Sequence, residues 1–167
     1  MTTTIIQTRA HLVDLLPPGS LVIELGVAAG LFAEEMLTRN PQIRYLGIDR
    51  WSDHHDVSEM LQAADRVRPF QTPHFITSTF SRAVTTIDDA SADMIYIDGY
   101  AHTGQERGET LRDWWPKLKP GGIFAGHDYD PEYPQTIAAV DEFARQHALQ
   151  IHLTGEPHLP SWWVLKP

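Results

Sequence analysis

The feature that most constrains this chain is an apolar run that ends in glycines. Residues 21–30 read Leu-Val-Ile-Glu-Leu-Gly-Val-Ala-Ala-Gly, and a helical pattern of apolar residues follows them. This order is typical of the strand–turn–helix unit of an open α/β sheet, in which Gly26 and Gly30 allow a tight turn or a close approach to a ligand. A second apolar run, residues 43–48, delivers Asp49 to a strand end, where a carboxylate can accept both hydroxyls of a ribose. The sequence therefore predicts a nucleotide pocket.

The residues of the turn indicate which nucleotide is bound. A dinucleotide-binding turn favours the pattern G-x-G-x-x-G, which directs backbone amides toward a pyrophosphate. Here the three positions hold Gly26, Ala28 and Leu31, and Glu24 places an acid at the strand end. An acid suits a cationic ligand and repels a pyrophosphate. S-adenosylmethionine carries an ammonium and a sulfonium but no phosphate, and it is the expected ligand.

In this segment the chain resembles the class I S-adenosylmethionine-dependent methyltransferases. Their first motif has the form acid-x-Gly-x-Gly-x-Gly, and residues 24–30 match it except for Ala28 in place of the middle glycine. The alternative is a strand and a buried turn of some other α/β protein. The resemblance implies a cofactor site made of Glu24, Gly26, Ala28, Gly30, Asp49 and Arg50, with Asp98 from a later strand and with Ser78 and Thr79 at the adenine edge.

The C-terminal half resembles a branch of the same family. One apolar run ends in Asp98, and a later run, introduced by Leu118-Lys119-Pro120-Gly121-Gly122, ends in His127 and Asp128. This order is similar to that of small-molecule and sugar O-methyltransferases (methyltransferase 24-like), some of which require a divalent metal. The resemblance implies that Asp98, His127 and Asp128 are the metal ligands. Carboxylate oxygens suit Mg²⁺, whereas the imidazole favours Mn²⁺ or Zn²⁺ or no metal at all. In the alternative interpretation the two acids cap helices and His127 is a buried structural imidazole.

His102 is the candidate base, and together with Asp98 it makes up the predicted catalytic pair. A hydroxyl must lose its proton to attack a methyl group, and histidine has the side-chain pKa nearest neutrality. In the related sugar enzymes a histidine closely follows the fourth-strand acid, but here the spacing is one residue longer. Tyr100 is an equally placed hydrogen-bond donor. The alternative is that His102 is only a loop or helix-cap residue.

Apolar strand patterns and helical patterns alternate along the chain, which predicts a parallel sheet covered by helices on both faces. The last two strands are joined by a loop too short for a helix, so the final strand is expected to run antiparallel. The expected fold class is α/β, a Rossmann-like class I methyltransferase fold with a seven-stranded, mostly parallel sheet in one domain over residues 1–167. The expected strands span 21–25, 43–49, 74–78, 93–97, 121–127, 150–154 and 161–165, and the expected helices span 4–16, 29–39, the second half of 51–67, 81–88, 104–116 and 135–147.

Composition excludes some partners. The 167 residues carry a net charge of −9, which disfavours nucleic acid, because its capture usually needs a basic face. No apolar run approaches the ~20 residues of a membrane span, and the Met-Thr-Thr-Thr start lacks the features of a signal peptide. We therefore expect a cytoplasmic protein with a small-molecule substrate and no membrane or nucleic-acid partner. A homo-oligomer is compatible with the sequence.

Other conspicuous residues have structural interpretations. Trp114 and Trp115 lie at helical spacing from leucines and are expected in the core, and one of Trp162 and Trp163 is expected to point inward. Trp51 could cover the adenine or the substrate mouth. The segment 53–56, Asp-His-His-Asp, is expected to be solvated, since adjacent residues do not face one another.

The sequence favours transfer of a methyl group from S-adenosylmethionine to a hydroxyl of a small molecule, with or without a Mg²⁺ or Mn²⁺ ion. The acceptor and the choice between oxygen and nitrogen stay open. One alternative is a cofactor-binding protein without transferase activity. The other is a nicotinamide-dependent oxidoreductase, against which Glu24 and Leu31 already argue.

Overall fold

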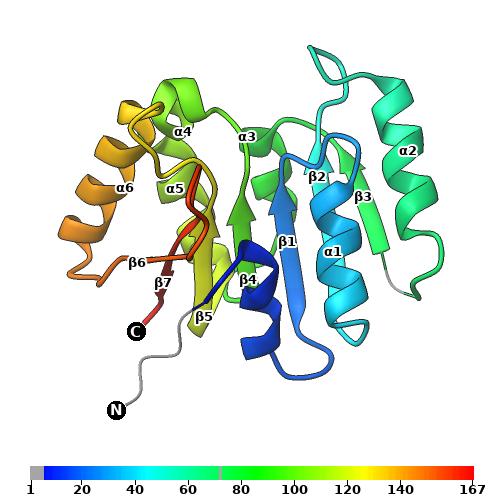
Figure 1. Cartoon of the computed structure of the whole chain (residues 1–167), viewed down its shortest axis with the longest axis horizontal. Coiled ribbons are helices and arrows are strands. Elements are labelled where there is room, and N and C mark those ends of the chain that lie inside the picture. Colours follow the sequence, from blue (N-terminus) through cyan, green and yellow to red (C-terminus); the bar gives the residue numbers. More distant parts are fainter. Residues whose placement is uncertain (1–5, 72) are drawn as a thin grey trace.

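The structure, a computed structural model, describes residues 6–71 and 73–167, and its centre is one seven-stranded sheet (Figure 1). The spatial order of the strands is β3-β2-β1-β4-β5-β7-β6. The first five strands pair in parallel, β7 runs antiparallel to β5, and β6 runs antiparallel to β7. The predicted fold class is therefore confirmed. The strands are β1 (Leu21–Leu25), β2 (Arg44–Asp49), β3 (Pro73–Thr77), β4 (Ala92–Ile97), β5 (Leu118–Gly126), β6 (His152–Leu153) and β7 (Trp162–Leu165).

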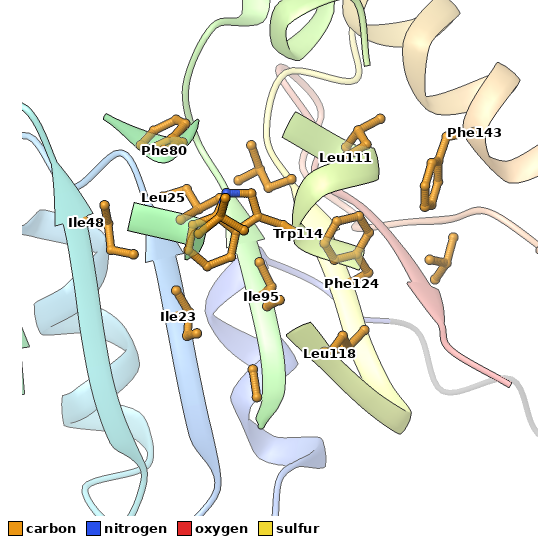
Figure 2. Close-up of a cluster of buried hydrophobic side chains, with 14 of the residues drawn as sticks. Ile23, Leu25, Ile48, Phe80, Ile95, Leu111, Trp114, Leu118, Phe124 and Phe143 are labelled. Carbon is orange, nitrogen blue, oxygen red and sulfur yellow. The ribbon is translucent and has the colours of Figure 1, made fainter. Parts of the chain in front are cut away.

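Helices cover both faces of the sheet, and alternate residues of each strand point to opposite faces. On one face, Phe80 and Trp114 cover inward strand side chains such as Ile23 and Ile95, and Phe143 packs against Phe124 at the side of the same cluster (Figure 2). On the other face, η1 and α1 pack onto a second set of strand residues. The helical elements are η1 (Arg9–Leu15), α1 (Leu31–Arg39), α2 (Val57–Val67), α3 (Phe80–Ala83), η2 (Val84–Thr86), η3 (Ala101–Thr103), α4 (Gly104–Arg107), α5 (Glu109–Trp114), η4 (Trp115–Lys117) and α6 (Pro134–Gln146).

The first helix differs from the predicted one. An α-helix was expected over residues 4–16, but η1 is a 3-10 helix that begins at Arg9. Residues 4 and 5 lie outside the described part of the chain. The carbonyl of Ile6 accepts a hydrogen bond from the N–H of Gly155 at 2.8 Å, so this stretch is tied to the C-terminal loop and no helix includes it.

The helix predicted over 104–116 is interrupted. Residues 104–108 all have positive φ, between +49° and +76°, which makes α4 a left-handed turn. Right-handed α5 follows it. Glycines at positions 104 and 108 accept this backbone without strain, whereas the three residues between them do not. The helix predicted over 81–88 is also shorter, because α3 passes into the 3-10 turn η2.

Of the two tryptophans expected in the core, one is fully buried and the other is half-buried against the same cluster. Trp114 is fully buried, and Trp115 packs edge-on against Phe124. Trp162 is buried, whereas its neighbour Trp163 is half-buried, as strand alternation predicted. None of the helices in residues 6–71 and 73–167 is long and apolar enough to cross a membrane.

Candidate functional site

A cavity of about 650 Å³ opens at the carboxyl edge of the sheet, the edge toward which β1 and β4 point upward in Figure 1. Backbone hydrogen bonds hold the strand ends together there. Gly26 donates its N–H to Ile48, Asp98 to Leu25, and His127 to Ile97, with N···O distances of 2.7–2.9 Å. Eight of the predicted site residues line the cavity: Glu24, Gly26, Ala28, Asp49, Arg50, Asp98, His102 and Asp128.

The two glycines of the turn are required by packing. Gly26 has φ +95°, and a Cβ there would lie 2.0 Å from the carbonyl oxygen of Asp98. Gly30 has φ +77°, and a Cβ there would lie 2.7 Å from the Cα of Ala63 in α2. Gly26 thus lets the end of β1 meet the end of β4, and Gly30 lets α1 approach α2. The predicted cofactor role of Gly30 lacks support from position, because this residue does not line the cavity.

Asp49 shapes the glycine loop. Its Oδ2 accepts hydrogen bonds from the backbone N–H groups of Val27 and Ala28, both at 2.9 Å, and its Oδ1 accepts one from the N–H of Trp51 at 3.1 Å. The carboxylate is buried, and it borders the cavity. A carboxylate offers about four lone-pair directions, so these bonds leave little free capacity unless a ligand replaces one of them.

Trp51 lies beneath the loop and does not cover the cavity. Its indole Nε1 donates to the carbonyl of Ala28 at 2.9 Å, and its ring meets Phe75 edge-on with the ring centroids 5.6 Å apart. The side chain is almost fully buried and contacts the core around Val27 and Ala63. The proposed adenine-covering role for Trp51 is therefore not the arrangement found; the indole supports the loop from below.

Glu24 is less charged than its place in the sequence suggested. The carboxyl is buried beside the Tyr45 hydroxyl, which donates a hydrogen bond to it. Burial raises the pKa of Glu24 to about 8. At pH 7 the carboxyl is therefore mostly protonated, and electrostatic attraction of a cationic ligand by Glu24 is weak.

The three predicted metal ligands lie together. One possible ligand atom from each of Asp98, His127 and Asp128 lies within 4.8 Å of the others. The His127 Nδ1 lies 2.9 Å from Asp128 Oδ1 and 3.6 Å from Asp98 Oδ1. A fourth residue joins them, since the Arg9 Nη1 donates to Asp98 Oδ2 at 3.0 Å.

Charge in this cluster is balanced by the chain itself. Although burial opposes protonation of His127, its hydrogen bonds to Asp128 and Asp98 raise its pKa to about 9, and His127 and Arg9 hold the pKa of Asp98 below its usual value. Two cations therefore face two carboxylates. The positions of Asp98, His127 and Asp128 fit one divalent ion, but the ion would have to replace the proton of His127 and compete with Arg9 for Asp98.

His102 and Tyr133 line the cavity side by side. His102 is exposed on η3, and its ring lies against that of Tyr133 with the centroids 5.0 Å apart. Tyr100, the alternative donor, lies half-buried in the same wall and packs against Phe80. His102 is placed where a base could meet a substrate in the cavity, and its catalytic role stays a prediction.

Ser78 and Thr79 border a different hollow, together with Arg50. The Thr79 hydroxyl accepts a hydrogen bond from the N–H of Arg82 at 3.3 Å and so caps α3. The structure does not bring these two residues to the main cavity. Arg50 borders both spaces and connects them.

Several residues of the cavity wall were not predicted from the sequence. Arg9 reaches it from 89 positions before its partner Asp98, and no sequence spacing signals that contact. Asp53, His54 and His55 also line it, although the segment was expected only to be solvated. These three residues follow closely after the strand that ends in Asp49, and this position in the sequence could have indicated that they border the cavity.

Comparison with known proteins gives this geometry a context. A family model described as a methyltransferase domain matches residues 23–129, which include the glycine loop, Asp49 and the Asp98–His127–Asp128 cluster. A search of curated proteins finds no match.

Solved structures share the fold at low sequence identity. A protein from Corynebacterium glutamicum superposes with a TM-score of 0.72 and 17% identity, over 94% of this chain and 77% of that one. The precorrin-6y C5,15-methyltransferase of Geobacter metallireducens gives a TM-score of 0.72 at 13% identity, over 94% and 85% of the two chains. A candidate caffeoyl-CoA O-methyltransferase of Staphylococcus aureus gives a TM-score of 0.72 at 14% identity, over 93% and 80%. Structural similarity at such low sequence identity shows a shared fold and nothing more.

Proposed function

This chain belongs to the methyltransferase domain family, and we propose that it transfers the methyl group of S-adenosylmethionine to a hydroxyl oxygen of a small molecule. Membership of the family implies S-adenosylmethionine as the methyl donor. The observation that carries the proposal is the 650 Å³ cavity at the carboxyl edge, where the glycine loop, Asp49, Asp98 and His102 meet. Ligands of open α/β folds bind in such crevices.

The strand order arranges the cofactor in the proposed complex. Asp49 stands at the end of β2 and accepts the ribose hydroxyls, after exchange of one of its backbone partners. The next strands in the sheet are β1 and β4, so the sulfur and the amino-acid end lie over Gly26 and Asp98. The acceptor then lies beyond them, between the end of β5 and His102.

The chemistry is an in-line displacement. The acceptor hydroxyl gives its proton to His102, its oxygen forms a bond to the methyl carbon, and the carbon–sulfur bond breaks with its electron pair left on sulfur. The sulfonium becomes a neutral thioether, S-adenosylhomocysteine. Alignment of the three reacting atoms in a dry cavity supplies most of the acceleration in such a step.

The test is turnover with and without His102. Release of S-adenosylhomocysteine is measured with a panel of hydroxylated and amine acceptors. We expect turnover with a hydroxylated acceptor, and we expect His102→Ala to slow it by about 10²- to 10⁴-fold, the usual contribution of a positioned base. The matched control is His74→Ala, which removes an exposed histidine on β3. Methylation of amines alone would contradict transfer to oxygen, and equal rates in both variants would remove His102 from the mechanism.

A metal-assisted form of the reaction is the second candidate. The observation that favours it is the convergence of Asp98, His127 and Asp128 on one point. A divalent ion held by these three residues would supply Lewis acidity to an acceptor oxygen and lower its pKa. We expect calorimetry to detect Mn²⁺ binding that weakens in Asp128→Asn, because a charged oxygen ligand is lost. If neither Mn²⁺ nor Mg²⁺ binds, the metal-free mechanism stands alone.

The two competing functions have distinct outcomes. A cofactor-binding protein without transferase activity would bind S-adenosylmethionine and transfer its methyl group to no acceptor. A nicotinamide-dependent oxidoreductase would bind NAD and leave S-adenosylmethionine unbound.

A further inference from the structure

Arg9 enters the cavity from outside the segment that matches the family model, which begins at residue 23. Its guanidinium lies over the ring of Phe32, 4.3 Å from the ring centroid, and its backbone N–H donates to Glu156 at 2.9 Å. The side chain is only 23% exposed, so it is held by contacts on several sides. Its five N–H donors serve Asp98 and the Tyr96 hydroxyl within the chain, which leaves donors for a ligand.

The surroundings of Arg9 are otherwise acidic. Asp49, Asp98 and Asp128 all border the cavity, and a ligand carboxylate would be repelled by them. Among the described residues of the cavity wall, only Arg9 and Arg50 have guanidinium or ammonium side chains. Arg50 follows Asp49 at the end of β2, whereas Arg9 is bonded to Asp98 at the end of β4.

Phe32 shows on which side of the sheet edge Arg9 lies. This residue belongs to α1, directly after the glycine loop, and packs in the same core as η1. His102 and Tyr133 approach from the opposite side, where η3 contacts α6. Arg9 therefore stands beside the amino-acid end of a cofactor whose ribose is on Asp49, and away from the acceptor.

We propose that Arg9 binds the carboxylate of the cofactor's amino-acid end and thereby selects S-adenosylmethionine over analogues without that carboxylate. The inference rests on the proposed function, since it presupposes this cofactor. The guanidinium fork matches a carboxylate, and Asp98 remains beside it to accept the cofactor's ammonium. The Arg9–Asp98 ion pair thus complements the carboxylate and the ammonium of the cofactor's amino-acid end.

The test compares two ligands that differ only in the carboxylate. S-adenosylhomocysteine has it, and its decarboxylated form, S-adenosyl-3-thiopropylamine, keeps the ammonium alone. We expect calorimetry to show that the wild-type chain prefers the first ligand by about 10- to 150-fold, the value of one charge-assisted hydrogen bond. Arg9→Met keeps an apolar stem over Phe32 and should reduce this preference to about 1- to 3-fold, and Arg9→Lys should restore part of it, because a point charge replaces the fork.

Arg50→Met is the matched control, because it also removes one cation from the cavity wall. It should leave the preference between the two ligands within about 3-fold of wild type, whatever it does to both affinities. Circular dichroism and thermal melts establish that each variant is folded. An Arg9→Met chain that is folded and keeps the full wild-type preference would overturn the proposal, as would a wild-type chain that binds both ligands equally. Binding of neither ligand to wild type would instead overturn the proposed function.

Discussion

The role assigned to Asp49 gives the most demanding prediction. Asp49→Asn keeps the shape of the side chain but removes its charge. The ribose hydroxyls then lose a charge-assisted acceptor, at about 1.5–3 kcal/mol, and the affinity for S-adenosylhomocysteine should fall by roughly 10- to 150-fold. The free energy of unfolding should fall as well, by about 1–3 kcal/mol, because the new amide group opposes one of the three backbone N–H groups that the carboxylate accepts.

A comparison of two ligands distinguishes the contact of Asp49 with the ribose from its effect on the glycine loop. Calorimetry compares S-adenosylhomocysteine with its 2′,3′-dideoxy analogue, which lacks both ribose hydroxyls. Wild type should bind the analogue more weakly, and Asp49→Asn should bind the two ligands nearly equally, since the residue and the hydroxyls act as one pair. Asp53→Asn, which removes a carboxylate from the same cavity wall, is the control and should preserve the discrimination. If Asp49→Asn loses the same factor for both ligands, Asp49 acts only through the glycine loop and the assignment is wrong.

Two further predictions concern stability. The pKa of His127 is about 9 when folded and near 6.5 when unfolded, so the stabilisation from its charged form is complete below pH 6.5 and is lost as the pH rises through 9. Urea unfolding should show a fall in the free energy of unfolding over this window, and His127→Gln should make the fall smaller by roughly 1–3 kcal/mol. The fall that remains comes from the buried Glu24 carboxyl, whose pKa of about 8 lies in the same window. The second prediction concerns the left-handed turn, where Glu106 has φ +55°. Glu106→Gly should raise the free energy of unfolding by up to about 1 kcal/mol, whereas Glu109→Gly in right-handed α5 should lower it by about 1 kcal/mol. If both variants are less stable than wild type, the turn is unstrained.

The sheet and half of the site were predictable because they depend on local patterns. Continuous apolar runs mark strands that are buried on both faces, and the residue that ends such a run in a parallel sheet lies at the ligand edge. Asp49, Asp98 and Asp128 were found in this way. Their convergence follows from the strand order, in which β2, β1, β4 and β5 are neighbours.

The remainder depends on contacts between distant segments. Arg9 meets Asp98 only because η1 packs against α1, and nothing in residues 6–16 encodes that partner. The raised pKa of Glu24 comes from its burial in the packed fold, which outweighs the opposing effect of the hydrogen bond from the Tyr45 hydroxyl, and a sequence motif encodes neither contact. Ser78 and Thr79 were placed correctly at the end of a strand, but the end of β3 opens into a separate hollow.

A crystal structure of the chain with S-adenosylhomocysteine is the most direct test of the proposed cofactor site. The ligand should lie in the cavity at the carboxyl edge, with its ribose on Asp49, its amino-acid end between Arg9 and Asp98, and His102 facing the space beyond its sulfur. A ligand bound elsewhere, or one whose sulfur is walled off from His102 and Asp128, would contradict it.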